Sequence, residues 1–146
     1  MPIDIRTAPY GAALLRVVLG GLFLAHAGLK LFVFTPAGTV HFFGSLGLPP
    51  AVAYFDMAAE IAGGVFLILG ILPRLVALLL TPILIGAIIT VHWANGFFFN
   101  NPNGGWEYPA FWTIALIVQA LIGDGAYALR HTPWFPAQPI TSSAVS

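Results

Sequence analysis

The sequence predicts an all-α integral membrane protein that folds as a four-helix bundle. Of its 146 residues, 59% are hydrophobic and 7% are charged, and the mean hydropathy is +0.93. The apolar residues gather in four long stretches. Soluble domains carry about 25% charged residues, whereas a membrane-spanning helix needs roughly 20 consecutive apolar residues. We therefore expect one membrane domain over residues 1–130. Its predicted partner is the lipid bilayer in which it is embedded.

The first predicted crossing covers residues 11–34. Its start resembles a secretory signal peptide, because Arg6 and Arg16 precede a short apolar run and the segment Ala25-His26-Ala27. The apolar run continues to Phe34, as in a spanning helix, so we expect it to remain uncleaved. Proline cannot continue a helix, which ends this crossing near Pro36. The aromatic residues of the following loop indicate a short segment at the membrane interface.

Three further crossings are predicted, over residues 51–72, 75–94 and 107–129. Pro49 and Pro50 suit the start of the second, where a missing N–H does no harm. Pro82 lies inside the third and should kink it, which membrane helices tolerate. Residues 131–146 are rich in proline and small polar residues, and we expect a flexible cytoplasmic tail.

The basic residues predict the orientation of the chain. Arg6, Arg16, Arg74 and Arg130 fall on one side of the predicted bundle, while the loops on the other side contain no Lys or Arg. The positive-inside rule then places both termini in the cytoplasm. We expect a multi-pass protein of the bacterial inner membrane, with the uncharged loops facing the periplasm.

Two absences limit the possible functions. The chain contains no cysteine, which excludes thiol exchange and thiolate-ligated cofactors. Its formal net charge is zero, so nothing points to a nucleic-acid partner. A redox role would need a bound cofactor or a partner protein.

The functional prediction rests on ionisable residues that alternating crossings would bring to the periplasmic end. Within apolar segments these residues are costly and mark functional sites by default. The six are His26, Lys30, Asp56, Glu60, His92 and Glu107. At 1.5 Å per residue, His26 and Glu60 lie at one depth, and Lys30 and Asp56 lie closer to the surface. We therefore expect two pairs, His26 with Glu60 and Lys30 with Asp56.

Several kinds of site would use this cluster. A quinone site needs an apolar slot and polar groups for the quinone oxygens, with a route for protons. His26 and Glu60 are the candidate catalytic pair, and the candidate quinone- or substrate-binding residues are Lys30, Asp56, His92, Trp106 and Glu107. A metal site is a second possibility, although the Glu-x-x-His motif of di-iron bundles is absent and we assign no metal ligand. Ion pairs that only fix helix register are a third.

Arg16 and Asp124 lie at similar depths near the cytoplasmic end of the first and fourth crossings. We expect a structural ion pair, because breaking a buried pair leaves an uncompensated charge.

The assembled motifs resemble the DoxX family of small four-helix membrane proteins. The resemblance covers approximately residues 11–130 and rests on Leu-Gly-Gly-Leu-Phe-Leu-Ala-His26-Ala-Gly-Leu-Lys30, Ala59-Glu60-Ile-Ala-Gly63-Gly64, Leu69-Gly70-Ile71-Leu72-Pro73-Arg74, Val91-His92 and Gly104-Gly105-Trp106-Glu107-Tyr108. It implies a four-helix bundle, and family members are often described as oxidoreductase subunits. One branch resembles the membrane subunit of thiosulfate:quinone oxidoreductases.

The leading hypothesis is therefore a quinone-linked oxidoreductase component that acts with a membrane or periplasmic partner protein. The alternatives are a non-enzymatic accessory subunit of a larger membrane complex, and a protein that binds a metal or another small molecule. A homo-oligomer is compatible with each of them. Family membership supports the fold better than the reaction.

Overall fold

The computed structural model describes residues 4–133, and within that range the chain is all-α. Five α-helices are accompanied by two short π-helical segments and one 3₁₀-helical segment, and the residue pair Ile71 and Arg130 forms an isolated β-bridge. In chain order the elements are α1 (Ala8–Gly28), η1 (Leu29–Val33), α2 (Thr35–Ser45), α3 (Pro50–Leu69), α4 (Pro73–Ala87), η2 (Ile88–His92), η3 (Trp93–Asn95) and α5 (Glu107–Ile122). The predicted all-α class is confirmed.

Three helical stretches are long and apolar enough to cross a membrane, which makes the chain a multi-pass membrane protein. They are Ala8–Val33, Pro50–Leu69 and Pro73–Asn95. The predicted interface segment is the short helix α2. The flexible tail predicted for residues 131–146 lies almost wholly outside the described range.

The fourth predicted crossing is shorter than expected. Helix α5 ends at Ile122 instead of Leu129, because Gly123 has φ +116° and Gly125 has φ +79°. Both values lie in the region that favours glycine. The Gln119 Nε2 group donates to the Gly123 carbonyl at 2.8 Å and satisfies the backbone at this end. With 16 residues, α5 is about 24 Å long at 1.5 Å per residue.

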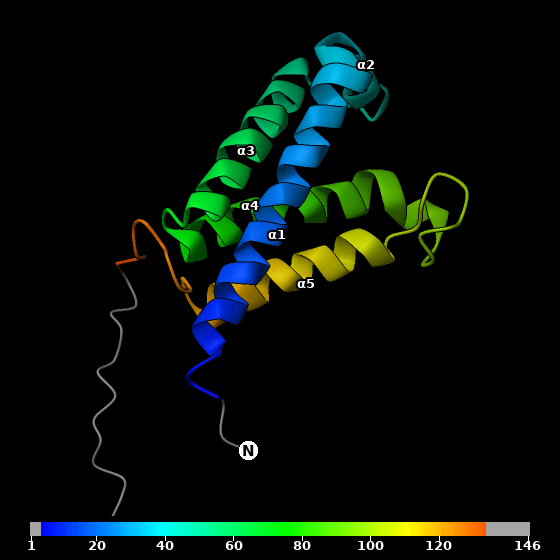
Figure 1. Cartoon of the computed structure of the whole chain (residues 1–146). Coiled ribbons are helices and arrows are strands. Elements are labelled where there is room, and N and C mark those ends of the chain that lie inside the picture. Colours follow the sequence, from blue (N-terminus) through cyan, green and yellow to red (C-terminus); the bar gives the residue numbers. More distant parts are fainter. Residues whose placement is uncertain (1–3, 134–146) are drawn as a thin grey trace, which may run out of the picture.

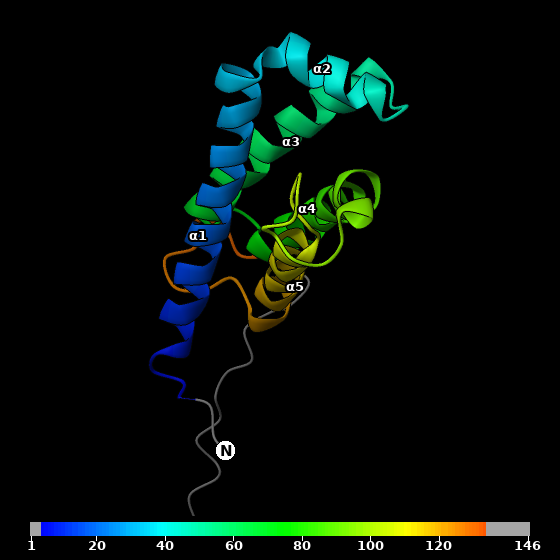
Figure 2. The same cartoon turned by 90° about the vertical axis from the view of Figure 1, so that its right-hand side faces the viewer.

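The long helices form two pairs, α1 beside α3 and α4 beside α5 (Figure 1). The pairs come together near the α3–α4 turn and diverge towards α2 and the loop over residues 95–106. Turning the molecule shows α2 across the far end of α1 and α3 (Figure 2). The pairs run in clearly different directions, so a four-helix bundle with near-parallel axes is not confirmed.

Close packing holds the helices together both within a pair and between the pairs. A Cβ at Gly20 of α1 would lie 2.6 Å from the Gly64 carbonyl oxygen of α3, so these backbones touch. Small residues permit such an approach between membrane helices. One residue earlier on α3, Gly63 faces Leu80 of α4 and so connects the two pairs. The apolar core continues through residues of α1, α3, α4 and α5, including Phe23, Leu67, Leu80, Trp112 and Leu116.

The segment over residues 123–132, which we call the C-terminal strap, lies at the side of the molecule opposite α2. Its Ala126 N–H donates to the Pro9 carbonyl at 2.8 Å, and its Arg130 N–H donates to the Gly70 carbonyl at 3.0 Å. In return the Leu72 N–H donates to the Arg130 carbonyl at 2.8 Å. The strap thus binds both the start of α1 and the α3–α4 turn.

Candidate functional site

Two π-helical segments place ionisable residues at the site. Lys30 lies in η1, at the end of α1, and His92 lies in η2, at the end of α4. A π-turn is wider than an α-turn and often marks a functional position in a helix. The Thr39 hydroxyl of α2 donates to the Lys30 carbonyl at 3.1 Å and ties α2 to η1.

Lys30 binds two carboxylates of α3. Asp56 and Glu60 lie four residues apart and therefore on one face of the helix. The Lys30 Nζ atom contacts Asp56 Oδ2, and it lies 2.9 Å from Glu60 Oε1. The side chains of Lys30 and Glu60 are 19% and 4% exposed. The Lys30–Asp56 pair is thus present, and the same ammonium also binds Glu60.

The second predicted pair is replaced by a different contact. Glu60 is paired with Lys30, while the His26 ring lies against the Trp112 ring with centroids 5.0 Å apart. The physical reason is that Asp56 and Glu60 share one face of α3 at i,i+4 spacing, so the long side chain of Lys30 reaches both carboxylates. Lys30 therefore also binds the deeper carboxylate, Glu60. The sequence had predicted His26 as the partner of Glu60 because these two residues lie at the same depth.

A cavity of about 520 Å³ lies beside this cluster and is lined by residues from α1, α2, α3, α4 and α5. We call it the polar cavity, although its wall is mainly apolar. Its ionisable lining residues are His26, Lys30, Asp56, Glu60 and His92. Such a combination of an apolar wall with a few polar groups is typical of small-molecule sites.

Two buried polar atoms of the cavity lining have no hydrogen-bond partner in the described part of the chain. They are Glu60 Oε2 and the indole Nε1 of Trp112. Glu60 is 3% exposed and Trp112 is also 3% exposed. Leaving a buried polar group unpaired costs about 1–3 kcal/mol. A ligand with an acceptor for the indole N–H and a hydroxyl that donates to the carboxylate oxygen would satisfy these two atoms.

The remaining candidates from the loop side divide into two groups. His92 lines the polar cavity, and its Nδ1 lies 2.9 Å from the Gly104 carbonyl oxygen. A carbonyl can only accept, so Nδ1 carries the hydrogen and Nε2 is the acceptor in the neutral ring. Trp106 and Glu107 are not among the residues that line the cavity.

Trp106 and Glu107 instead hold the loop over residues 95–106 in shape. The Trp106 ring stacks on Trp93 with centroids 5.7 Å apart and meets the edge of Phe97 at 4.8 Å. The Glu107 N–H donates to the Phe97 carbonyl at 2.9 Å. Tyr108 and Trp112 also line the cavity, but they were not identified as site residues from the sequence. Their i,i+4 spacing on one face of α5 was the available signal.

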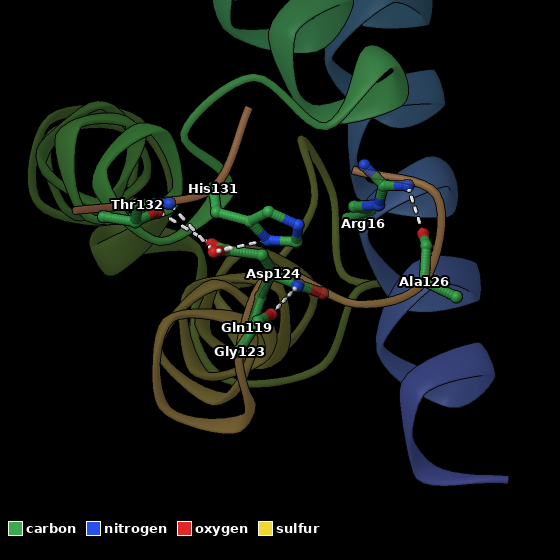
Figure 3. Close-up of polar contacts among 7 residues, drawn as sticks. All are labelled: Arg16, Gln119, Gly123, Asp124, Ala126, His131 and Thr132. Carbon is green, nitrogen blue, oxygen red and sulfur yellow. Dashed lines mark hydrogen bonds and ion pairs between the residues drawn. The ribbon is translucent and has the colours of Figure 1, made fainter. Parts of the chain in front are cut away.

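The predicted Arg16–Asp124 ion pair is not formed. Arg16 is 2% exposed and its Nη2 donates to the Ala126 carbonyl at 2.7 Å. The Asp124 carboxylate instead accepts from the backbone and hydroxyl of Thr132, at 2.9 and 2.7 Å, and lies 3.3 Å from His131 Nδ1 (Figure 3). The turn at Gly123 takes Asp124 out of the helix, which explains the change of partners.

Charge and geometry limit what the site can do. One ammonium faces two carboxylates, and a histidine lies on each side of the cavity, on α1 and on η2. These groups can bind ligand oxygens and can transfer protons. Across residues 4–133, no group of three or more His, Asp or Glu side chains is placed to hold a metal ion.

Comparisons with known proteins concern mainly the first two thirds of the chain. The sequence profile of the DoxX family matches residues 11–93, which is more than half of the chain. A relative from Bacillus subtilis (strain 168), named "Putative oxidoreductase CatD", is 48% identical over 81 residues. The match covers 56% of this chain and 59% of that relative, so the chain spans less than two thirds of it. No solved structure matches the chain significantly.

Proposed function

The chain belongs to the DoxX family, and on that premise we propose that it is a quinone-linked component of a membrane oxidoreductase. The observation that carries the proposal is the polar cavity, with unpaired Glu60 Oε2 and Trp112 Nε1 in a mainly apolar wall. The name of the Bacillus subtilis relative supports an oxidoreductase role. The ionisable lining residues all lie within the matched segment 11–93.

The residues present fit a quinone head group. The Trp112 N–H and the Lys30 ammonium can donate to ring oxygens, and the Phe43 and Tyr108 side chains of the lining offer apolar surface to a planar ring. A bound quinone would supply two-electron, two-proton chemistry. The chain's own part is to bind the head, exclude water and move protons, while a partner subunit with its own redox group supplies the electrons.

Protons can reach the site through a short series of groups. Glu60, with one carboxylate oxygen unpaired, is the proton-transfer group nearest the centre of the cluster. His26 lines the same cavity beside Trp112 and is its partner in this role. Lys30 and Asp56 set the local charge, and His92 offers Nε2 to an incoming hydroxyl.

The proposal includes a placement in the cell. The four apolar helices would surround the cavity as a bundle in the bacterial inner membrane, with both termini in the cytoplasm. This orientation follows from the basic residues at the end of the molecule that holds the C-terminal strap. The loop over residues 95–106 and α2 then face the periplasm.

One measurement tests the function. Wild-type protein is purified in mild detergent, and its bound quinone is extracted and quantified by mass spectrometry. We expect Glu60→Gln and His26→Ala to reduce the bound quinone at least about fivefold, while the charge-matched control Asp4→Asn, at an exposed position, keeps it. Absence of quinone from the wild type after reconstitution with quinone-containing lipid would contradict the proposal.

The ion pairs favour a second candidate function. Lys30 connects the end of α1 to α3 through both carboxylates, which is also what a register-fixing cluster in an accessory subunit would do. In that case the Glu60→Gln and His26→Ala proteins would lose thermal stability with no change in ligand content. The same samples therefore separate the two functions.

A further inference from the structure

A second cavity of about 390 Å³ lies next to the polar cavity, and we call it the apolar groove. It runs between η1 and α2 and is lined by Lys30, Phe34, Gly38, Thr39, Phe42 and Phe43. Lys30 is the one charged residue in this lining. Since the Lys30 ammonium is held by Asp56 and Glu60, mainly its aliphatic stem is left for the groove.

The two cavities share a wall. Lys30, Phe42 and Phe43 line both of them. The two cavities are therefore adjacent, and a chain attached to a polar head beside Glu60 would reach the groove by passing between these shared side chains. The polar groups lie on one side of the wall, and the apolar space lies on the other.

The groove opens among apolar side chains that are not covered by protein. Phe34 and Phe42 of its lining are 58% and 46% exposed, and the neighbouring Phe32 is 84% exposed. Phe32 lies within the membrane-spanning stretch Ala8–Val33, and Phe34 follows it directly. Exposed apolar side chains at the end of a spanning helix face lipid, so the opening faces the bilayer and not bulk water.

We propose that the apolar groove binds the hydrocarbon tail of the ligand whose head occupies the polar cavity. The ligand class is then an amphiphilic quinone that carries an isoprenoid or alkyl chain and enters sideways from the bilayer. This inference rests on the proposed function and adds the tail to it. A water-soluble, tail-less quinone would use the polar cavity alone.

Gly38→Leu tests the groove without altering the head site. A Cβ at Gly38 would meet only Thr35 Oγ1, at 3.5 Å, so the larger side chain fits and takes up groove space. Gly44→Leu is the matched control, because Gly44 lies on the same helix, lines neither cavity and has nothing within 4 Å of its Cβ position. Both changes raise helix propensity equally. Gly38→Ala is a milder second variant.

Binding is measured in nanodiscs by quinone quenching of tryptophan fluorescence, since Trp112 lines the polar cavity. The probes are decylubiquinone and the corresponding tail-less benzoquinone. Each variant is compared with wild type for the same probe, so partitioning into the bilayer cancels. We expect Gly38→Leu to weaken decylubiquinone binding about tenfold, which is about 1.4 kcal/mol, with Gly38→Ala intermediate. Gly44→Leu and the tail-less probe should show no change.

Three results would overturn the inference in distinguishable ways. If Gly38→Leu weakens both probes equally, or neither, while Glu60→Gln weakens both, then the head site stands and the tail site is rejected. If Gly44→Leu acts like Gly38→Leu, the effect belongs to α2 as a whole and the groove is not a tail site. If wild type binds neither probe, the proposed function fails, and this inference fails with it.

Discussion

Among single residues, Lys30 determines the form of the polar cluster because its ammonium is shared by Asp56 and Glu60. All three side chains are largely withdrawn from solvent. Removing one member of a buried ion cluster leaves the remaining charges uncompensated. The free energy lost in this way exceeds the net stability that the intact cluster provides. Stability measurements can therefore test whether the two carboxylates depend on this lysine.

We expect Lys30→Met to lower the free energy of unfolding by about 3 kcal/mol, because two buried carboxylates lose their common partner. The triple variant Lys30→Met/Asp56→Asn/Glu60→Gln should recover most of the loss. Thermal unfolding in detergent, followed by circular dichroism, measures both. Equal destabilisation of the single and triple variants would show that the lysine stem, and not its charge, supports the fold.

The sequence identified the acidic, basic and histidine residues of the cavity and one of their two predicted pairs, Lys30 with Asp56. Charge within apolar segments is a strong signal, and it identified His26, Lys30 and Glu60. Which of these side chains contact one another depends on their orientation and reach, and hydropathy does not report either. Asp124 was misassigned for a similar reason, since a glycine turn carried it away from Arg16.

Among the helices, the contact of α1 with α3 sets the separation of the backbones behind the site. Gly20 and Gly64 face each other, and a Cβ on either would lie within 3 Å of the other's carbonyl oxygen. Backbone atoms cannot move aside as a flexible side chain can. Gly63, one residue earlier on α3, lies instead against the side chain of Leu80.

Gly64→Val should therefore separate α1 from α3 and destabilise the protein by about 1–3 kcal/mol, the usual cost of overpacking. Gly21→Val is the control, because its Cβ position on α1 has nothing within 4 Å. Both variants add the same β-branched side chain to a helix. Unfolding temperatures that drop to the same extent would indicate a propensity effect and would contradict a close helix contact.

Helix positions were predictable because prolines and apolar runs mark them directly, as at Pro50 and Pro73. The π-helical ends of α1 and α4 were not predictable, because a change of hydrogen-bond pattern over five residues does not alter the hydropathy of the sequence. The short α5 was missed because its apolar sequence continues beyond the residue where the backbone turns.

In the whole molecule, two helix pairs meet near the strap and diverge towards α2 and the loop over residues 95–106 (Figure 1). Residues of both pairs line the polar cavity. The angle between the pairs follows from packing of whole faces, which single-sequence patterns do not encode. The basic residues, in contrast, do encode an orientation, and Arg74 and Arg130 lie at the strap end. The orientation can be measured on its own.

The lack of cysteine makes the chain suitable for single-cysteine labelling. We expect a cysteine at Asn100, in the exposed part of the loop, to react with a membrane-impermeant maleimide in intact spheroplasts. A cysteine at the exposed Thr7 should react only after the membrane is permeabilised. Labelling of Thr7→Cys from outside would reverse the proposed orientation and place the polar cavity towards the cytoplasm.

The hydrogen bond between Arg16 and the strap can form only late in the synthesis of the protein. Arg16 and Ala126 are 110 residues apart in sequence, and synthesis proceeds from the N-terminus. The guanidinium of the first helix is therefore synthesised well before its acceptor carbonyl exists. This end of the molecule can close only when the residues of the strap have left the ribosome.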